Sequence, residues 1–138
     1  MWEHDLGDPT RLSSQPRLNQ SRFCHSSVCA GMNLYVVGGI NKVCHLDTIE
    51  VLSLQNSKDA SWHIVDGGFA SRANPAISAL CPYADRKDER ILIWGGFNGE
   101  SREFLGDVYI FDPTTDKSTK VAESNDTVIS CVDQCYAV

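Results

Sequence analysis

Cysteine and histidine side chains stand next to each other at two places in this 138-residue chain, and both residue types are common zinc ligands. The two pairs are Cys24-His25 and Cys44-His45. A structural zinc site usually combines close pairs, with roughly two to four residues between cysteines. Four residues separate Cys24 from Cys29, and three separate Cys131 from Cys135. This spacing leaves metal binding open, but the apolar runs around most of the cysteines favour buried or edge thiols that behave as small hydrophobic side chains.

Two other short sequences have residue types suited to catalysis or phosphate binding. Gly95-Gly96-Phe97-Asn98-Gly99 is rich in glycine, but a phosphate loop opens directly into a helix, and here a polar loop and an apolar strand follow. His25-Ser26-Ser27 places a base beside two hydroxyls, yet it lies in a strand, where a hydrogen-bonded core histidine is expected. No Gly-x-Ser-x-Gly motif occurs. We therefore predict no enzyme activity, no catalytic residue, no cofactor and no bound metal.

Composition narrows the class of protein and of partner. Hydrophobic residues make up 42% of the chain and charged residues 22%, which is typical of a globular domain. The net charge of −6 argues against nucleic acid and against an anionic membrane surface, because both need clustered lysine and arginine. No secretory signal and no apolar stretch of membrane-spanning length is seen. We expect reduced cysteines and a cytoplasmic location, with the nucleus as an alternative.

The secondary-structure elements that would position these side chains follow a pattern that repeats along the chain. Leu34-Tyr35-Val36-Val37-Gly38-Gly39 and Ile91-Leu92-Ile93-Trp94-Gly95-Gly96 are both apolar runs that end in a glycine pair. Each is followed by a polar loop, an aspartate (Asp47 or Asp107) and a second apolar run. Self-similarity at a period near fifty residues indicates a repeat architecture, in which no unit buries its faces alone.

Strand patterns fill both units, and no helical period is evident. The first unit predicts strands at 23–30, 34–37, 48–54 and 62–65, with Ile49 and Val51 on one face and Glu50 on the other. The second unit predicts strands at 75–80, 91–94 and 108–111, a loop at 97–106 and a weak fourth strand at 120–121. Four consecutive strands in each unit predict one antiparallel sheet.

These units resemble the kelch repeat, in which each repeat forms a four-stranded blade of a β-propeller. The matching residues are Arg22, His25, the run 34–39, Asp47 and Trp62 in the first unit, and Arg72, the run 91–96, the run 107–112 and Pro113 in the second. In two respects the units depart from the family pattern. Its third-strand tyrosine is Tyr109 in the second unit, where the first has Ile49, and its fourth-strand tryptophan is Trp62, where the second offers only 118–120.

The resemblance implies an all-β fold, a partial β-propeller built of four-stranded antiparallel kelch-type blades. We assign residues 1–21 to an N-terminal arm or the remnant of a preceding blade, with Trp2 as its fourth-strand tryptophan or as a simple anchor. Residues 22–66 form blade 1, residues 67–122 blade 2, and residues 123–138 the start of a truncated third blade. Structural roles fall to Gly38, Gly39, Trp62, Gly95, Gly96 and Tyr109. Propellers have about four to eight blades, so other blades of the same or another chain are needed to close the ring.

The resemblance also implies a function, that of a protein-interaction scaffold presenting loops to an unidentified protein partner. The family commonly binds through the loops that correspond to residues 41–46, 66–74 and 97–106. Candidate partner-binding residues are Asn41, Lys42, His45, Arg72, Asn74, Asn98, Glu100, Arg102 and Glu103. Arg72 and Arg102 suit an acidic peptide, because a guanidinium binds carboxylates well. The alternatives are a catalytic, oxidase-like propeller with its active site outside this chain, and a purely structural blade segment.

Overall fold

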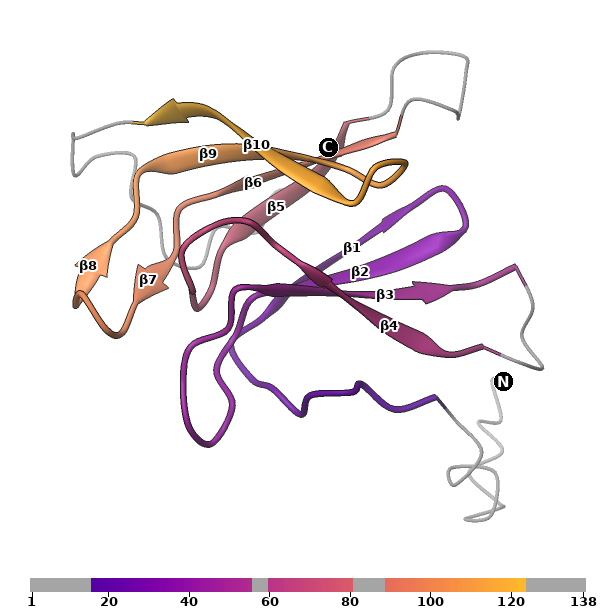
Figure 1. The fold of residues 1–138 in the computed structure, drawn as a ribbon, viewed down its shortest axis with the longest axis horizontal. Helices are drawn as coiled ribbons and strands as arrows, with labels where there is room; N and C mark the ends of the chain where they lie inside the picture. The colour runs from indigo at the N-terminus through magenta and orange to yellow at the C-terminus, as the bar shows by residue number, and fades with distance from the viewer. Residues whose placement is uncertain (1–15, 56–59, 81–88, 124–138) are drawn as a thin grey trace, which may run out of the picture.

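The described part of the chain, residues 16–55, 60–80 and 89–123 of a computed structural model, contains strands and no helix (Figure 1). The first sheet has the order β1-β2-β3-β4 and the second the order β5-β6-β9-β10, and every neighbouring pair is antiparallel. The first sheet comprises β1 Ser26–Ala30, β2 Asn33–Val37, β3 Thr48–Ser53 and β4 Trp62–Asp66. The second comprises β5 Ala76–Leu80, β6 Arg90–Trp94, β9 Asp107–Asp112 and β10 Lys117–Glu123, and a small hairpin pairs β7 Phe97–Asn98 with β8 Glu103–Phe104.

The predicted all-β fold with four antiparallel strands in each unit is confirmed, and two details differ. The segment 97–106, predicted as a loop, contains the hairpin β7–β8, whose cross-strand pair Phe97 and Phe104 brings two rings to a centroid distance of 5.3 Å. The fourth strand of the second sheet, predicted as weak, is the seven-residue β10 with a bulge between Lys120 and Ala122. The predictions for residues 1–15 and 124–138, including Trp2, Cys131 and Cys135, lie outside the described residues, as does Cys81.

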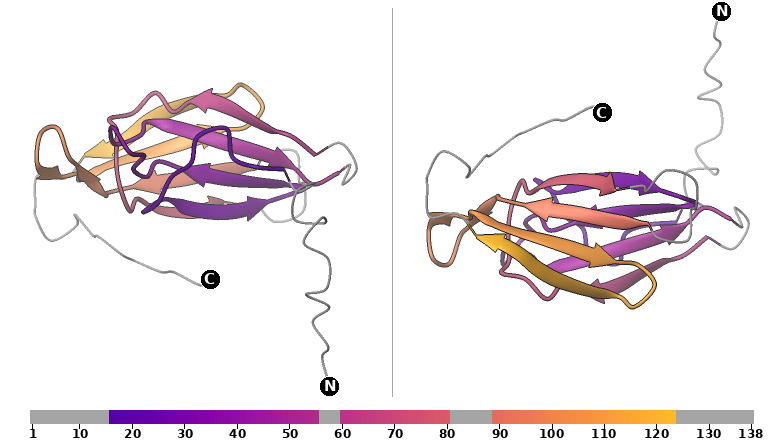
Figure 2. Two further views of the ribbon diagram at one scale, coloured as in Figure 1. Left: turned by 90° about the horizontal axis from the view of Figure 1, so that it is seen from below. Right: turned by 90° about the horizontal axis from the view of Figure 1, so that it is seen from above.

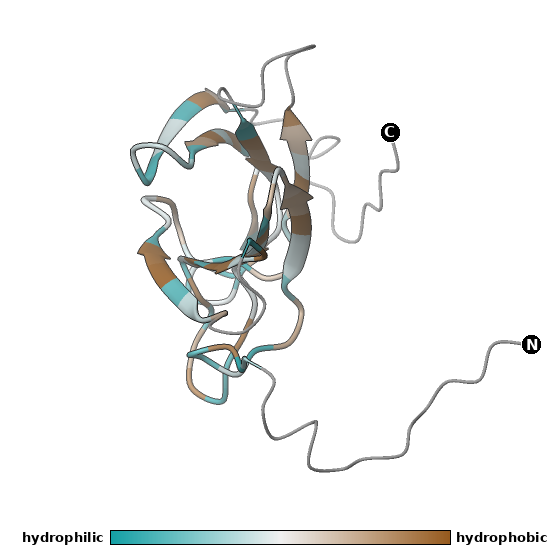
Figure 3. Ribbon diagram, turned by 90° about the vertical axis from the view of Figure 1, so that its right-hand side faces the viewer, coloured by the Kyte–Doolittle hydropathy of each residue, from teal (hydrophilic) through white to brown (hydrophobic). Residues whose placement is uncertain are grey.

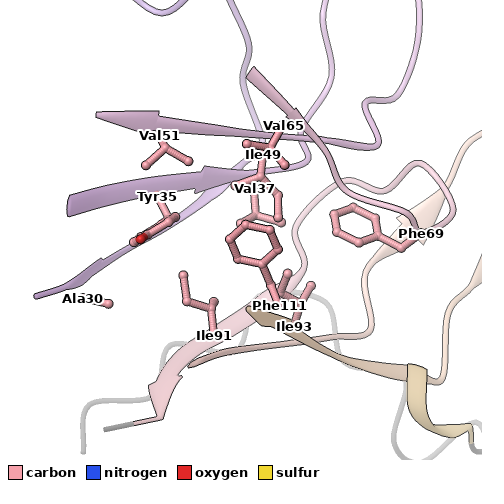
Figure 4. Packing of buried hydrophobic residues seen from close by; sticks show 10 residues of the cluster. All are labelled: Ala30, Tyr35, Val37, Ile49, Val51, Val65, Phe69, Ile91, Ile93 and Phe111. Carbon is pink, nitrogen blue, oxygen red and sulfur yellow. The ribbon is translucent and has the colours of Figure 1, made fainter. Parts of the chain in front are cut away.

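The two sheets stack face to face, and their facing residues form the core (Figures 2 and 4). Alternation along the strands sends every second side chain to the same face, and in Figure 3 apolar and polar positions alternate along them. The first sheet and the chain just after it contribute Ala30, Tyr35, Val37, Ile49, Val51, Val65 and Phe69, and the second sheet Ile91, Ile93 and Phe111. The rings of Tyr35 and Phe111 meet edge to face across the interface, with centroids 6.1 Å apart. The prediction that Ile49 and Val51 share a face is thus confirmed.

The opposite face of the first sheet is covered by the chain that leads into it. Residues 16–22, drawn in indigo below β4 in Figure 1, place the backbone N–H groups of Asn19 and Gln20 on the carboxylate of Glu50, at 2.7 and 3.0 Å. The indole N–H of Trp62 donates to the carbonyl of Pro16 at 3.3 Å. Residues 66–72 precede the second sheet in the same way, and we call 16–22 and 66–72 the entry segments.

Strand register shows which residues of the two sheets are equivalent. Val37 pairs with Ile49 in the first sheet, and Trp94 with Val108 in the second. Asp107 is therefore equivalent to Thr48, and Tyr109 to Glu50. The predicted equivalences of Asp47 with Asp107 and of Ile49 with Tyr109 are wrong by one residue, a shift that exchanges the two faces of a strand.

The fourth-strand tryptophan is missing from the second sheet, as predicted. Leu52 pairs with Trp62 and the equivalent Phe111 with Ser118, so Ser118 occupies the tryptophan position. The Ser118 hydroxyl is buried without a hydrogen-bond partner among the described residues. At this edge Phe69 of the second entry segment provides the packing instead. The centroid of its ring lies 5.8 Å from that of Tyr109.

A substitution at the glycine that directly follows β2 tests how closely the second entry segment packs on the first sheet. Gly38 has φ +62°, and a Cβ there would lie 2.5 Å from the carbonyl oxygen of Arg72. Gly68 has a similar φ of +64°, but its nearest neighbour would be the Cβ of Ser118 at 3.9 Å. We expect both Gly→Ala variants to lose about 1–2 kcal/mol from the left-handed backbone. Gly38→Ala should lose about 1–3 kcal/mol more from the clash.

Urea unfolding of Gly38→Ala and Gly68→Ala measures this difference directly. Equal losses in the two variants would contradict the close approach of Arg72 to Gly38.

Candidate functional site

Three connections that are distant in sequence meet at one end of the stacked sheets. They are the β2–β3 loop, the β4–β5 connection and the segment carrying the β7–β8 hairpin, which lie at the left in Figure 1. Together with the first entry segment they border an open groove with a volume of about 520 Å³. It is lined by Gln20, Asn41, Cys44, His45, Leu46, Asp47, Thr48, Phe69, Ala70, Ser71, Asn98 and Glu100.

Backbone hydrogen bonds hold these connections to one another. The N–H of Arg72 donates to the carbonyl of Leu46 at 3.0 Å, and the carbonyl of Arg72 accepts from the N–H of Gly39 at 2.8 Å. The next residue, Ala73, exchanges two hydrogen bonds of 2.9 Å with Phe97. One stretch of two residues therefore links all three connections, and the groove has a rigid frame.

The Arg72 side chain is fully buried and is not among the groove-lining residues, although it contacts one of them, Phe69. Its guanidinium donates to both carboxylate oxygens of Asp107, at 2.7 and 3.1 Å, and to the carbonyls of Gly95 and Ala70, each at 3.0 Å. It also stacks on the rings of Phe69 and Tyr109, at 4.8 and 5.4 Å from their centroids. The structure thus corrects the prediction that Arg72 meets a partner, because its charge is already neutralised inside the protein.

The first sheet has an equivalent arginine with a different acid. Arg22 donates to the carbonyl of Gly38 at 2.8 Å, as Arg72 does to that of Gly95. Its NH2 group contacts Glu50 at 2.5 Å, and both side chains are fully buried. Thr48 occupies the position of Asp107, so in the first sheet the acid has moved two residues along the same face of the strand.

The β2–β3 loop contacts the β7–β8 hairpin at the groove. The imidazole of His45 lies edge-on to the ring of Phe97, with centroids 6.0 Å apart. Gly99 approaches the imidazole so closely that a Cβ there would lie 2.0 Å from its Cε1 atom. Of the predicted partner-binding residues, His45 therefore lies in the groove and also joins its two rims.

The two predicted asparagines shape the loops that carry them. The side-chain oxygen of Asn41 accepts from the N–H groups of Val43 and Cys44, at 2.8 Å each. The equivalent oxygen of Asn98 accepts from Glu100 and Ser101, at 2.8 and 3.1 Å. Both asparagines line the groove, and each closes a turn by a hydrogen bond to its own backbone.

The remaining predicted residues lie outside the groove lining, apart from Glu100, which is exposed on its rim. Lys42, Arg102 and Glu103 are exposed on the β2–β3 loop and the hairpin. Asn74 is half-buried, and its N–H donates to the carbonyl of Cys24 at 2.7 Å. Three lining residues fall outside the predicted binding loops: Gln20, brought in by the first entry segment, Asp47, predicted only as a repeat-motif aspartate, and Thr48.

Among the residues considered for metal binding or catalysis, His25 was predicted to be a hydrogen-bonded core histidine, and this prediction is wrong because His25 is exposed. Cys24, Cys29 and Cys44 are exposed free thiols, and Cys29 lies on β1, an edge strand of the first sheet. His25 precedes β1 and is exposed, although partial desolvation and the charge of Arg22 lower its pKa. Within the described ranges, no three His, Cys, Asp or Glu side chains gather as a metal site would require. The same residues include no helix with the length and hydropathy needed to cross a membrane.

Comparison with known proteins agrees with the repeated sheets. The family model described as Kelch motif matches residues 21–65 and 87–125, which together make up more than half of the chain. The curated proteins contain no match to the chain.

Proposed function

The chain belongs to the kelch-repeat family, and from this premise we propose that it is a protein-interaction scaffold whose recognition surface is the loop groove. Two blades do not close a propeller, which has about four to eight, so the surface works within a larger ring. The groove lies at the edge where the loops of neighbouring blades meet, and it extends over both blades.

The groove itself is the observation that supports this proposal. It combines loops from two blades in one hollow of about 520 Å³, within the range of sites that take up a ligand or a few side chains. The backbone hydrogen bonds of Arg72 and Ala73 hold its rims in place. Loops positioned by a rigid scaffold are common recognition sites, because binding then costs little ordering entropy.

Filling the groove tests the proposal. Ala70 lines the groove and its side chain is exposed, so Ala70→Trp should occupy the hollow without disturbing the core. Ala122→Trp is the matched control, because Ala122 is exposed on β10 away from the groove. We expect proteins captured by the wild-type chain from a source lysate to be retained by Ala122→Trp and lost with Ala70→Trp.

Quantitative mass spectrometry of the three captures measures the outcome. Equal recovery of every captured protein by Ala70→Trp and Ala122→Trp would contradict recognition through the groove.

A further inference from the structure

The groove is lined by the imidazole of His45 and by two acidic side chains. They are Asp47 on the β2–β3 loop and Glu100 on the hairpin, so the two carboxylates come from different blades. Both residues are exposed, and neither carboxylate has an ion pair among the described residues. Within the described ranges, no lysine or arginine lines the hollow.

Arg72, which the sequence predicted to bind an acidic partner, does not present its charge to the groove. Arg72 is fully buried and does not line the groove, and Asp107 and two carbonyls accept hydrogen bonds from its guanidinium. Lys42 and Arg102 are exposed on the same connections but are not among the lining residues. The groove therefore presents negative charge to a ligand, in a chain whose net charge is −6.

The floor of the groove adds apolar surface to this charge. Leu46 and Phe69 are buried side chains that line it, and Ala70 lies exposed beside them. A long side chain with an apolar stem and a cationic end suits such a site, because its stem covers apolar surface while its charge reaches the carboxylates.

We propose that the groove binds a protein segment that presents arginine or lysine, with Asp47 and Glu100 as the residues that recognise its charge. This inference rests on the proposed function and names the chemistry of the partner. It reverses the polarity predicted from the sequence, in which Arg72 and Arg102 met an acidic peptide.

Selection from a library of short random peptides, displayed on phage and panned on the full chain, tests the inference without knowledge of the natural partner. Each enriched peptide is then synthesised with a fluorescent label. Its affinity is measured at mildly alkaline pH, where histidine is neutral. The variants are Ala70→Trp, the neutralised groove Asp47→Asn/Glu100→Gln, and a matched control, Asp116→Asn/Glu123→Gln, which removes two exposed acids outside the groove lining.

We expect enriched peptides that contain arginine or lysine, bind weakly to Ala70→Trp and bind about fivefold to tenfold more weakly to Asp47→Asn/Glu100→Gln. The control variant should bind them like the wild type. Peptides that need an open groove but lack cations, or that bind the neutralised groove equally well, would overturn the inference and leave the proposed function standing. If no enriched peptide is sensitive to Ala70→Trp, the proposed function fails as well.

Discussion

Arg72→Met should lower the free energy of unfolding by about 3 kcal/mol or more, as measured by urea denaturation. Methionine retains an unbranched apolar stem but removes the donors that serve Asp107, Gly95 and Ala70. Asp107 is a buried residue, 7% exposed, so its carboxylate would remain as a buried charge without its partner. Breaking a buried ion pair from one side is costly for this reason, even where the intact pair contributes little.

Two further variants separate this cause from a general sensitivity to substitution. Arg102→Met removes an exposed arginine and should change stability by no more than about 0.5 kcal/mol. The double variant Arg72→Met/Asp107→Leu leaves no uncompensated charge and should be more stable than Arg72→Met alone. Equal stability of Arg72→Met and Arg102→Met would contradict a stabilising role for the ion pair of Arg72 with Asp107.

Glu50→Ala should have an effect of similar size, about 3 kcal/mol, and should also release the first entry segment. The carboxylate of Glu50 accepts from Arg22 and from the N–H groups of Asn19 and Gln20. Without it, the buried guanidinium of Arg22 loses its counter-charge. Because Arg17 is exposed in this segment, the rate of trypsin cleavage after Arg17 should rise together with the loss of stability.

The residues of the second blade suggest a second substitution that should restore stability lost by a change at Glu50. There a tyrosine stands at the place of Glu50 and an aspartate at the place of Thr48. Glu50→Tyr alone should be strongly destabilised, and adding Thr48→Asp should recover part of the loss by returning a carboxylate to the arginine. If Thr48→Asp gives no recovery, the two sites are not equivalent in the way that the strand register indicates.

Much of the fold follows from patterns that are local in sequence. Short apolar runs, glycine pairs and polar turns predicted the strands and their order, because alternation and turn chemistry act over a few residues. The loss of the fourth-strand tryptophan was also visible, and register places Ser118 at its position. The hairpin β7–β8 escaped prediction because its strands have two residues each, too few to show a period.

The errors arose where distant residues had to be matched. Matching Asp47 with Asp107 by residue type was wrong, since the equivalent of Asp107 is Thr48 and the first blade uses Glu50 as its acid. Arg72 was predicted to be a loop residue available to partners. The carboxylate that binds it belongs to Asp107, which lies 35 residues downstream on another strand. Only folding of the second sheet brings them together. The groove's polarity could not be predicted while Arg72 was counted among its residues.

The entry segments bear on how such a chain can be copied by duplication. Each blade receives its buried arginine from the chain that precedes its first strand, so a duplicated unit beginning at β5 would leave Arg72 behind. The copy would then inherit Asp107 without the charge that neutralises it. A unit copied from residue 66 to residue 123 would inherit both. The repeat unit that is copied intact thus begins upstream of its four strands. Recombination at that point yields copies in which the buried arginine and the acid that pairs with it are both present.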